Sequence, residues 1–233
     1  METIAGRDVQ IVVADDVEEV AGLVADRLVE TARAGGSIVA TGGSGPRRAY
    51  QLAAEREADW SRAQIWWGDE RCVPPDDENS NYRNVKEELL DKLQVQPEAV
   101  HRMRGELGKD EGARDYEQQL QSASLDLVLL GMGPDGHIAS LYPNQPTLQE
   151  TGRKVIGAEA HLEPWIDRIS LTLPSLRAGG TVLFIVTGES KADAAARAFT
   201  GDPDPGTPAS LVRADSGNTV AILDLEAAAR LSR

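Results

Sequence analysis

The chain has 233 residues, with 24 Lys and Arg against 38 Asp and Glu, which gives a formal net charge of −14. A chain of this length buries a large hydrophobic core, and we expect residues 1–233 to form a single domain. The acidic balance argues against nucleic acid as a partner, because phosphate backbones are bound by basic surfaces. An anionic substrate would therefore need a local positive site within a surface that is negative overall.

Cysteine and histidine are scarce, with one Cys and three His in the chain. These counts exclude a disulfide framework and a Cys-based zinc cage, and we predict no metal site. The N-terminus lacks a basic start followed by an apolar run, and no stretch approaches the ~20 apolar residues that span a bilayer. The sequence predicts a cytoplasmic protein without a membrane partner, and its size and polar surface favour a monomer.

Short runs of β-branched residues alternate with helical stretches along the chain, which indicates an α/β fold around a mostly parallel sheet. Strands are predicted at residues 9–13, 37–41, 64–67, 100–103, 125–130, 168–173, 181–187 and 219–223. The first predicted helix is capped by Asp15 or Asp16 and ends near Arg33. Further helices are predicted at residues 46–55, 82–93, 112–121, 190–199 and 225–231, and a polar surface loop at residues 74–81.

Ligands collect outside the carboxyl ends of the strands in an open parallel sheet, so the loops that follow the strands are the candidate functional segments. The first such loop contains Gly42, Gly43 and Ser44, and a helix follows it at Pro46. Glycines let the backbone approach a ligand closely, and the free N–H groups at a helix start attract an anion. The loop is thus a candidate phosphate cradle, and its alternative is an ordinary tight turn. No Gly-Lys-Ser/Thr follows, so it is not a Walker loop.

The second loop places Asp69, Glu70 and Arg71 directly after a strand with two tryptophans. A guanidinium binds phosphate or carboxylate oxygens bidentately, and a carboxylate can orient a water or a sugar hydroxyl. The alternative interpretation is a local salt bridge between these charges.

The third loop, residues 131–136, matches the dinucleotide pattern G-x-G-x-x-G after a strand. That pattern needs a helix to follow, and here Pro143 and Pro146 come too soon, so we reject NAD binding. His137 remains on a glycine-rich turn, where it suits a general base that Asp135 can orient. A structural role is the alternative for His137, and it is the role we predict for His101 and His161, which have no such surroundings.

The fourth loop, residues 187–191, ends in Ser190 and Lys191 at the start of a predicted helix. Ser190 can cap that helix, whereas a cation in the first turn is unfavourable beside the positive end of the helix dipole. A bound anion would explain Lys191, and an ordinary exposed lysine is the alternative.

Two long motifs in these loops resemble a known family. Residues 67–74 with residues 76–81 closely resemble one signature of the 6-phosphogluconolactonases, and residues 129–137 resemble their second signature. Shorter matches at residues 42–44, 171–174 and 188–191 follow in the right order along the whole chain. The resemblance implies a modified Rossmann-like α/β fold, mostly parallel with helices on both faces of the sheet. It also implies a carboxylic ester hydrolase that converts the small sugar-phosphate lactone 6-phospho-D-glucono-1,5-lactone to 6-phospho-D-gluconate, the second step of the oxidative pentose phosphate pathway.

By this resemblance His137 activates the attacking water and no metal or organic cofactor is needed. The residues implied in phosphate binding are Gly42, Gly43, Ser44, Arg71 and Lys191. Arg71 could instead stabilise the developing oxyanion, and Asp69 is the candidate for orienting water or a sugar hydroxyl. Gly45 and Ile138 depart from the family, which often has Thr at both places, so no hydroxyl is available there.

Three other functions remain as alternatives. An isomerase/deaminase of the glucosamine-6-phosphate type has a similar Asp-Gly-His motif, but it carries Glu five residues after the histidine, where this chain has Tyr142. It also has Asp-Glu-Tyr where this chain has Asp-Glu-Arg at residues 69–71. A non-catalytic sugar-phosphate sensor usually carries a DNA-binding module, for which this chain has no spare basic segment. A dehydrogenase is disfavoured by the interrupted third loop.

Overall fold

The computed structural model describes residues 2–6, 8–56 and 58–231. An eight-stranded sheet has the order β1-β2-β11-β10-β7-β3-β4-β6, and a three-stranded sheet has the order β5-β9-β8. The strands of the larger sheet are β1 Glu2–Gly6, β2 Val9–Ala14, β3 Ser37–Ala40, β4 Gln64–Trp67, β6 Ala99–Val100, β7 Leu127–Gly131, β10 Thr181–Val186 and β11 Asn218–Asp224. Those of the smaller sheet are β5 Asp69–Arg71, β8 Val155–Ala158 and β9 Arg168–Leu171.

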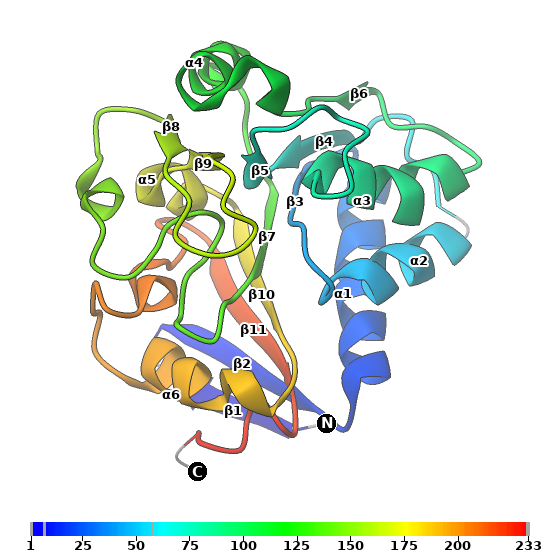
Figure 1. Cartoon of the computed structure of the whole chain (residues 1–233). Coiled ribbons are helices and arrows are strands. Elements are labelled where there is room, and N and C mark those ends of the chain that lie inside the picture. Colours follow the sequence, from blue (N-terminus) through cyan, green and yellow to red (C-terminus); the bar gives the residue numbers. More distant parts are fainter. Residues whose placement is uncertain (1, 7, 57, 232–233) are drawn as a thin grey trace.

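The larger sheet is parallel except for the antiparallel pair β1 and β2. The α-helices of the described residues are α1 Val17–Ala34, α2 Arg47–Glu55, α3 Asn81–Glu88, α4 Lys109–Leu120, α5 Leu173–Arg177 and α6 Ala192–Thr200. Figure 1 shows α1, α2 and α3 on one side of this sheet and α5 and α6 on the other. The central strands β7 and β10 are therefore buried on both faces, which is why they are continuous apolar runs. The predicted α/β class, mostly parallel with helices on both faces, is confirmed.

Helix α1 begins and ends at residue types that favour helix ends. Asp16 caps it by accepting hydrogen bonds from the N–H groups of Glu18 and Glu19, both at 2.9 Å. Gly35 ends it with a φ of 75°, in the left-handed region that favours glycine. The prediction for this helix is confirmed.

Three predictions of local secondary structure are wrong. Residues 225–231 form turns rather than a helix, because their amides make scattered bonds, such as Ala227 N–H to the Asp224 carboxylate, instead of a regular ladder. Residues 69–71 were predicted as loop and form β5, antiparallel to β9. Ser190 caps no helix, since residues 189–191 form a 3₁₀ turn and α6 begins at Ala192 with no side-chain cap.

The two sheets meet at Gly68, between β4 and β5. Its N–H donates to the carbonyl of Ala40 in β3, at 3.0 Å, and its carbonyl accepts from the N–H of Leu171 in β9, at 2.8 Å. One residue is therefore hydrogen-bonded to the larger sheet on one side and to the smaller sheet on the other.

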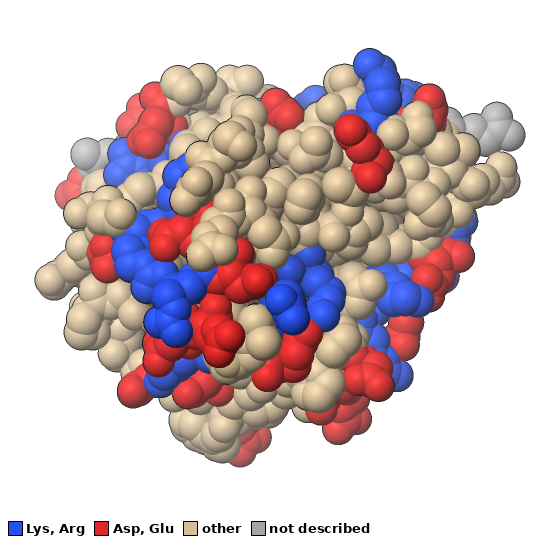
Figure 2. Space-filling view, turned by 90° about the horizontal axis from the view of Figure 1, so that it is seen from above, with Lys and Arg blue, Asp and Glu red and all other residues tan. Residues whose placement is uncertain are grey.

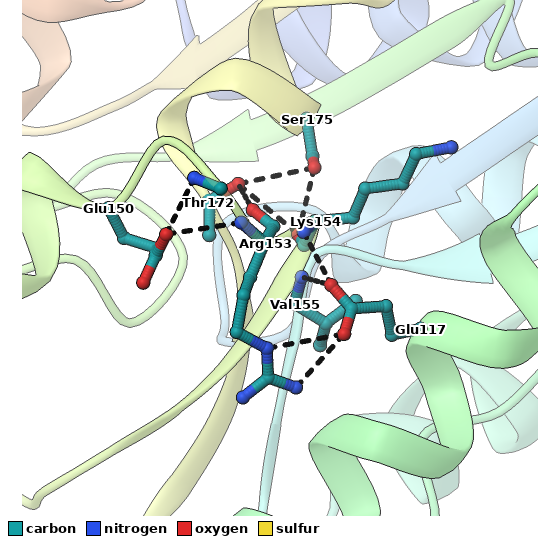
Figure 3. A network of polar contacts seen from close by, with 8 residues as sticks. Glu117, Glu150, Arg153, Lys154, Val155, Thr172 and Ser175 are labelled. Carbon is teal, nitrogen blue, oxygen red and sulfur yellow. Dashed lines mark hydrogen bonds and ion pairs between the residues drawn. The ribbon is translucent and has the colours of Figure 1, made fainter.

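A polar network fixes the smaller sheet to helix α4 (Figure 3). The Glu117 carboxylate on α4 accepts from the N–H groups of Lys154 and Val155, at 2.6 and 3.3 Å, and from the guanidinium of Arg153. Thr172 and Ser175 bind the neighbouring carbonyls, with Thr172 Oγ1 at 2.9 Å from Arg153 O and Ser175 Oγ at 2.8 Å from Lys154 O. These bonds satisfy backbone groups of residues 153–155, where β8 begins at the edge of the smaller sheet.

Candidate active site

A cleft of about 280 Å³ opens at the carboxyl ends of β3, β7 and β10. The four loops predicted to hold functional residues all contribute to its lining. All seven candidate site residues line it, namely Gly42, Gly43, Ser44, Asp69, Arg71, His137 and Lys191. Their roles stay predictions, but the chain segments that carry them, far apart in sequence, meet in one cavity.

The glycine loop after β3 is anchored from helix α2. The buried Tyr50 hydroxyl accepts from Thr41 N–H at 3.0 Å and donates to Thr41 O at 2.8 Å. Gly43 has a φ of 87°, which few other residues adopt. The N–H groups of residues 42–44 have no hydrogen-bond partner within the described part of the chain. The loop thus presents free backbone donors to the cleft, as an anion cradle requires.

Asp69 and Arg71 face the cleft from strand β5. Asp69 is only 8% exposed, and its carboxylate accepts from Ser140 Oγ at 2.7 Å and from Asn81 Nδ2 at 3.2 Å. Arg71 Nη1 donates to Asn81 Oδ1 at 2.6 Å and to Asn79 O at 2.9 Å. No carboxylate of the described residues lies within ion-pair distance of Arg71, so the local salt bridge is not formed.

Glu70 received no role from the sequence, yet it organises this part of the site. Its buried carboxylate accepts from the N–H groups of Arg71, Asn81 and Tyr82, each at 2.7 Å, and from Ser80 Oγ at 3.0 Å. Burial raises the pKa of Glu70, and these donors oppose that shift. The carboxylate lies at the N-terminus of α3, where the helix dipole favours a negative charge.

The end of the polar segment 74–81 is therefore not at the surface, as was predicted for the whole segment. Ser80 and Asn81 are 3% and 2% exposed, because the Glu70 carboxylate binds both of them against β5. Asn81 also lines the cleft, and the sequence analysis missed it. Its place in a long motif directly before a predicted helix was the available signal.

His137 and Asp135 form a close pair on the turn after β7. His137 Nδ1 lies 2.6 Å from Asp135 Oδ1, which also accepts from His137 N–H at 3.1 Å. Burial acts to raise the pKa of Asp135, but the hydrogen bonds from His137 outweigh it and hold that pKa below its ordinary value. An ionised carboxylate only accepts, so Nδ1 carries the proton and Nε2 of the neutral ring is the free acceptor. No helix follows this turn within residues 137–145, as Pro143 and Pro146 predicted.

Lys191 directly precedes helix α6 and lines the cleft. Its Nζ makes no hydrogen bond or ion pair among the described residues, and burial lowers the pKa of Lys191, which the nearby Asp135 carboxylate opposes only in part. Its loop is held by Asp224, whose carboxylate accepts from Gly188 N–H at 2.9 and 3.1 Å.

Outside the cleft, basic side chains pair with acidic neighbours. Examples are Arg48 with Glu18 at 2.7 Å and Lys86 with Asp91 at 2.6 Å. Figure 2 shows acidic and basic side chains lying next to one another on the face that it views. Arg71 and Lys191 differ from these surface residues because neither pairs with a carboxylate of the described residues.

Two further findings concern metal ions and membranes. Among the described residues, no group of three or more His, Cys, Asp or Glu is arranged to hold a metal ion. In the same part of the chain, no helix is both long enough and apolar enough to cross a membrane.

The fold and the cleft define an α/β protein with a histidine–aspartate pair and two cationic side chains, Arg71 and Lys191, at the carboxyl ends of its parallel strands. Residues 12–221 match the model of the family described as glucosamine-6-phosphate isomerases/6-phosphogluconolactonase, and the chain belongs to this family. It is 39% identical to the 6-phosphogluconolactonase of Streptomyces coelicolor over 249 residues, covering 96% of this chain and 95% of that protein.

Solved structures show the same fold. The 6-phosphogluconolactonase of Thermotoga maritima superposes with a TM-score of 0.80 at 28% identity, covering 92% of this chain and 98% of that chain. A monomeric glucosamine-6-phosphate deaminase superposes with a TM-score of 0.84 at 18% identity, covering 94% and 99%. Because both proteins share the fold, the residues in the cleft must distinguish the two activities.

Proposed function

We propose that the cleft hydrolyses 6-phospho-D-glucono-1,5-lactone to 6-phospho-D-gluconate, with His137 as the general base. The observation that carries the proposal is His137, paired with Asp135, in one cavity with Arg71 and Lys191, neither of which forms an ion pair with a described residue. Relatives at 33–39% identity over most of the chain are named 6-phosphogluconolactonases, which supports the same activity here. The substrate is therefore a small sugar-phosphate lactone.

The chemistry needs one water and one proton acceptor. As the water oxygen attacks the lactone carbonyl, Nε2 of His137 takes its proton, and the carbonyl oxygen becomes an oxyanion. The tetrahedral intermediate then collapses, the bond from the carbonyl carbon to the ring oxygen breaks, and the imidazolium returns its proton to the leaving ring oxygen. Asp135 stabilises the imidazolium between the two transfers, and this kind of proton transfer contributes about 10²–10⁴-fold to the rate.

Substrate position comes from the phosphate. Lys191 and the N–H groups of Gly42, Gly43 and Ser44 face the cavity without internal partners, and together they form the local positive site that an acidic protein needs. Arg71 either joins them or lies at the developing oxyanion, and in both positions its charge would stabilise a negative group. Asp69, held by Ser140 and Asn81, is placed to orient the water or a sugar hydroxyl.

The residue at the position of the deaminase's ring-opening carboxylate does not support the deaminase alternative. Where that enzyme carries a ring-opening carboxylate, Tyr142 lies with its ring centroid 5.1 Å from that of His137. A phenol at this place does not supply the carboxylate that sugar ring opening uses. The cytoplasmic location and the monomeric state stay predictions.

The test compares the wild type with His137→Ala in an assay of acid release from freshly generated lactone. We expect kcat to fall about 10²–10⁴-fold while the affinity for 6-phosphogluconate changes little, because the base acts mainly in the transition state. A reaction without enzyme corrects for spontaneous hydrolysis, and His161→Ala, which removes an exposed histidine, serves as the matched control. Wild-type turnover by His137→Ala would refute the base assignment. Ammonia release from glucosamine 6-phosphate would favour the deaminase.

A further inference from the structure

Two opposite charges of the site lie on the same strand without pairing. Asp69 and Arg71 are two residues apart on β5, so their side chains leave the same face of the strand, and both line the cleft. Side chains so placed ordinarily attract one another. Instead, one amide separates them: Asn81 Oδ1 accepts from Arg71 Nη1 at 2.6 Å, and Asn81 Nδ2 donates to Asp69 Oδ1 at 3.2 Å and to Asp69 O at 2.9 Å.

We infer that Asn81 is a positioning residue that keeps Asp69 and Arg71 from forming an ion pair with each other. The inference rests on the site roles proposed above for these two residues. An internal pair would neutralise the guanidinium and the carboxylate together, and the substrate would have to break it. With the amide between them, both groups are oriented and both remain available to the substrate.

Chemistry fixes the orientation of the amide. The guanidinium of Arg71 only donates, so it must face the amide oxygen, and the carboxylate of Asp69 only accepts, so it must face the amide nitrogen. An aspartate in place of Asn81 would repel Asp69 and pair with Arg71. Asparagine is the short side chain that offers one acceptor and one donor in these directions.

The amide is also held firmly. Asn81 is the first residue of α3 and 2% exposed, and its N–H donates to the buried Glu70 carboxylate at 2.7 Å. On its other side lies the glycine loop: a Cβ added to Gly42 would be 1.8 Å from Asn81 Oδ1, so the amide occupies the space of a side chain at this position. The phosphate cradle and the Asp69–Arg71 spacer are therefore packed against each other.

The test uses the affinity for 6-phosphogluconate, measured by isothermal titration calorimetry. This product carries a phosphate and a carboxylate, so its affinity depends on Arg71 whichever of the two groups the guanidinium binds. In Asn81→Ala, Asp69 can pair with Arg71. If this pair forms for most of the time, the fraction of protein with an available Arg71 falls, and the affinity for 6-phosphogluconate drops about 10- to 100-fold. Asp69→Asn alone is the reference, because it measures what the Asp69 carboxylate itself contributes to product binding, and the gain in the double variant below must exceed the effect of this single substitution.

The decisive variant is the double substitution Asn81→Ala with Asp69→Asn. Removing the Asp69 charge frees Arg71 again, so the double variant should bind 6-phosphogluconate more tightly than Asn81→Ala alone. A residue that only stabilised the fold would show no such rescue. In Asn81→Asp the new carboxylate itself pairs with Arg71, so adding Asp69→Asn should restore nothing. Asn84→Ala, one helical turn along α3, is the control for disturbance of that helix.

The inference is overturned if Asn81→Ala binds like the wild type, or if the double variant binds no better than Asn81→Ala. Arg71→Ala separates this failure from that of the proposed function. If Arg71→Ala binds 6-phosphogluconate like the wild type, the proposed role of Arg71 is wrong and the inference falls with it. If Arg71→Ala binds weakly while Asn81→Ala does not, the inference alone is wrong.

Discussion

A single methyl group at Gly133 should displace the proposed base. A Cβ on Gly133 would lie 2.0 Å from Nδ1 of His137 and 2.4 Å from Oδ1 of Asp135, although ordinary contact begins at 3.4 Å. The imidazole must therefore retreat by about 1.4 Å, and a misplacement of about 1 Å at a reacting group lowers rates about 100-fold. This corresponds to about 2.7 kcal/mol of transition-state stabilisation.

The assay is acid release from the freshly generated lactone by Gly133→Ala, with thermal unfolding as the check that the fold persists. Gly133 does not have a positive φ, so alanine adds no backbone strain there. Gly22→Ala in helix α1 is the control, because its Cβ would meet a single atom, at 3.9 Å. A kcat of Gly133→Ala equal to that of the wild type would refute the reasoning that the His137 ring must keep its place.

Two further outcomes concern Lys191 and Tyr50. Burial lowers the pKa of Lys191 below the ordinary 10.5, so its charge is lost as pH rises through that lowered pKa. Calorimetric affinity for 6-phosphogluconate should fall as this charge is lost and stay level in Lys191→Arg, whose guanidinium keeps its proton; a fall that persists in Lys191→Arg would contradict the assignment. Tyr50→Phe leaves the buried N–H and carbonyl of Thr41 without a partner, which should lower the urea-measured free energy of unfolding by about 1–3 kcal/mol. An unchanged value would show that water replaces the hydroxyl.

The sequence was most informative where physical rules are local. Glycines next to a strand end mark places where the backbone approaches a ligand, and this rule led to Gly42 and to the turn that carries His137. Asp16 and Gly35 are likewise local signals, because a cap and a left-handed residue need no distant partner. The cap at Asp16 and the helix end before Gly35 were predicted from the chain alone and are confirmed, whereas the roles of Gly42 and His137 stay predictions.

The rest depends on contacts between distant segments. Strand β5 has three residues, two of them acidic, and it forms because β9 pairs with it from almost 100 positions further along the chain. Asn81 looked like one more polar residue in a loop, and only the folded chain shows that Glu70 buries it between Asp69 and Arg71. The error at residues 225–231 is local instead, since an apolar pattern does not reveal that turns follow Asp224, whose carboxylate binds Ala227 N–H three residues on.

The hydrogen bonds of Gly68 have a consequence for how the site is aligned. His137 and Lys191 follow strands of the larger sheet, whereas Asp69 and Arg71 belong to the smaller one. The cleft therefore lies between the two sheets. Gly68 hydrogen-bonds these sheets to each other, through Ala40 of the larger sheet and Leu171 of the smaller one. The relative position of these two pairs of side chains therefore depends on how the two sheets are bonded together, and Glu117 on α4 contributes by binding Lys154 N–H beside β8 of the smaller sheet.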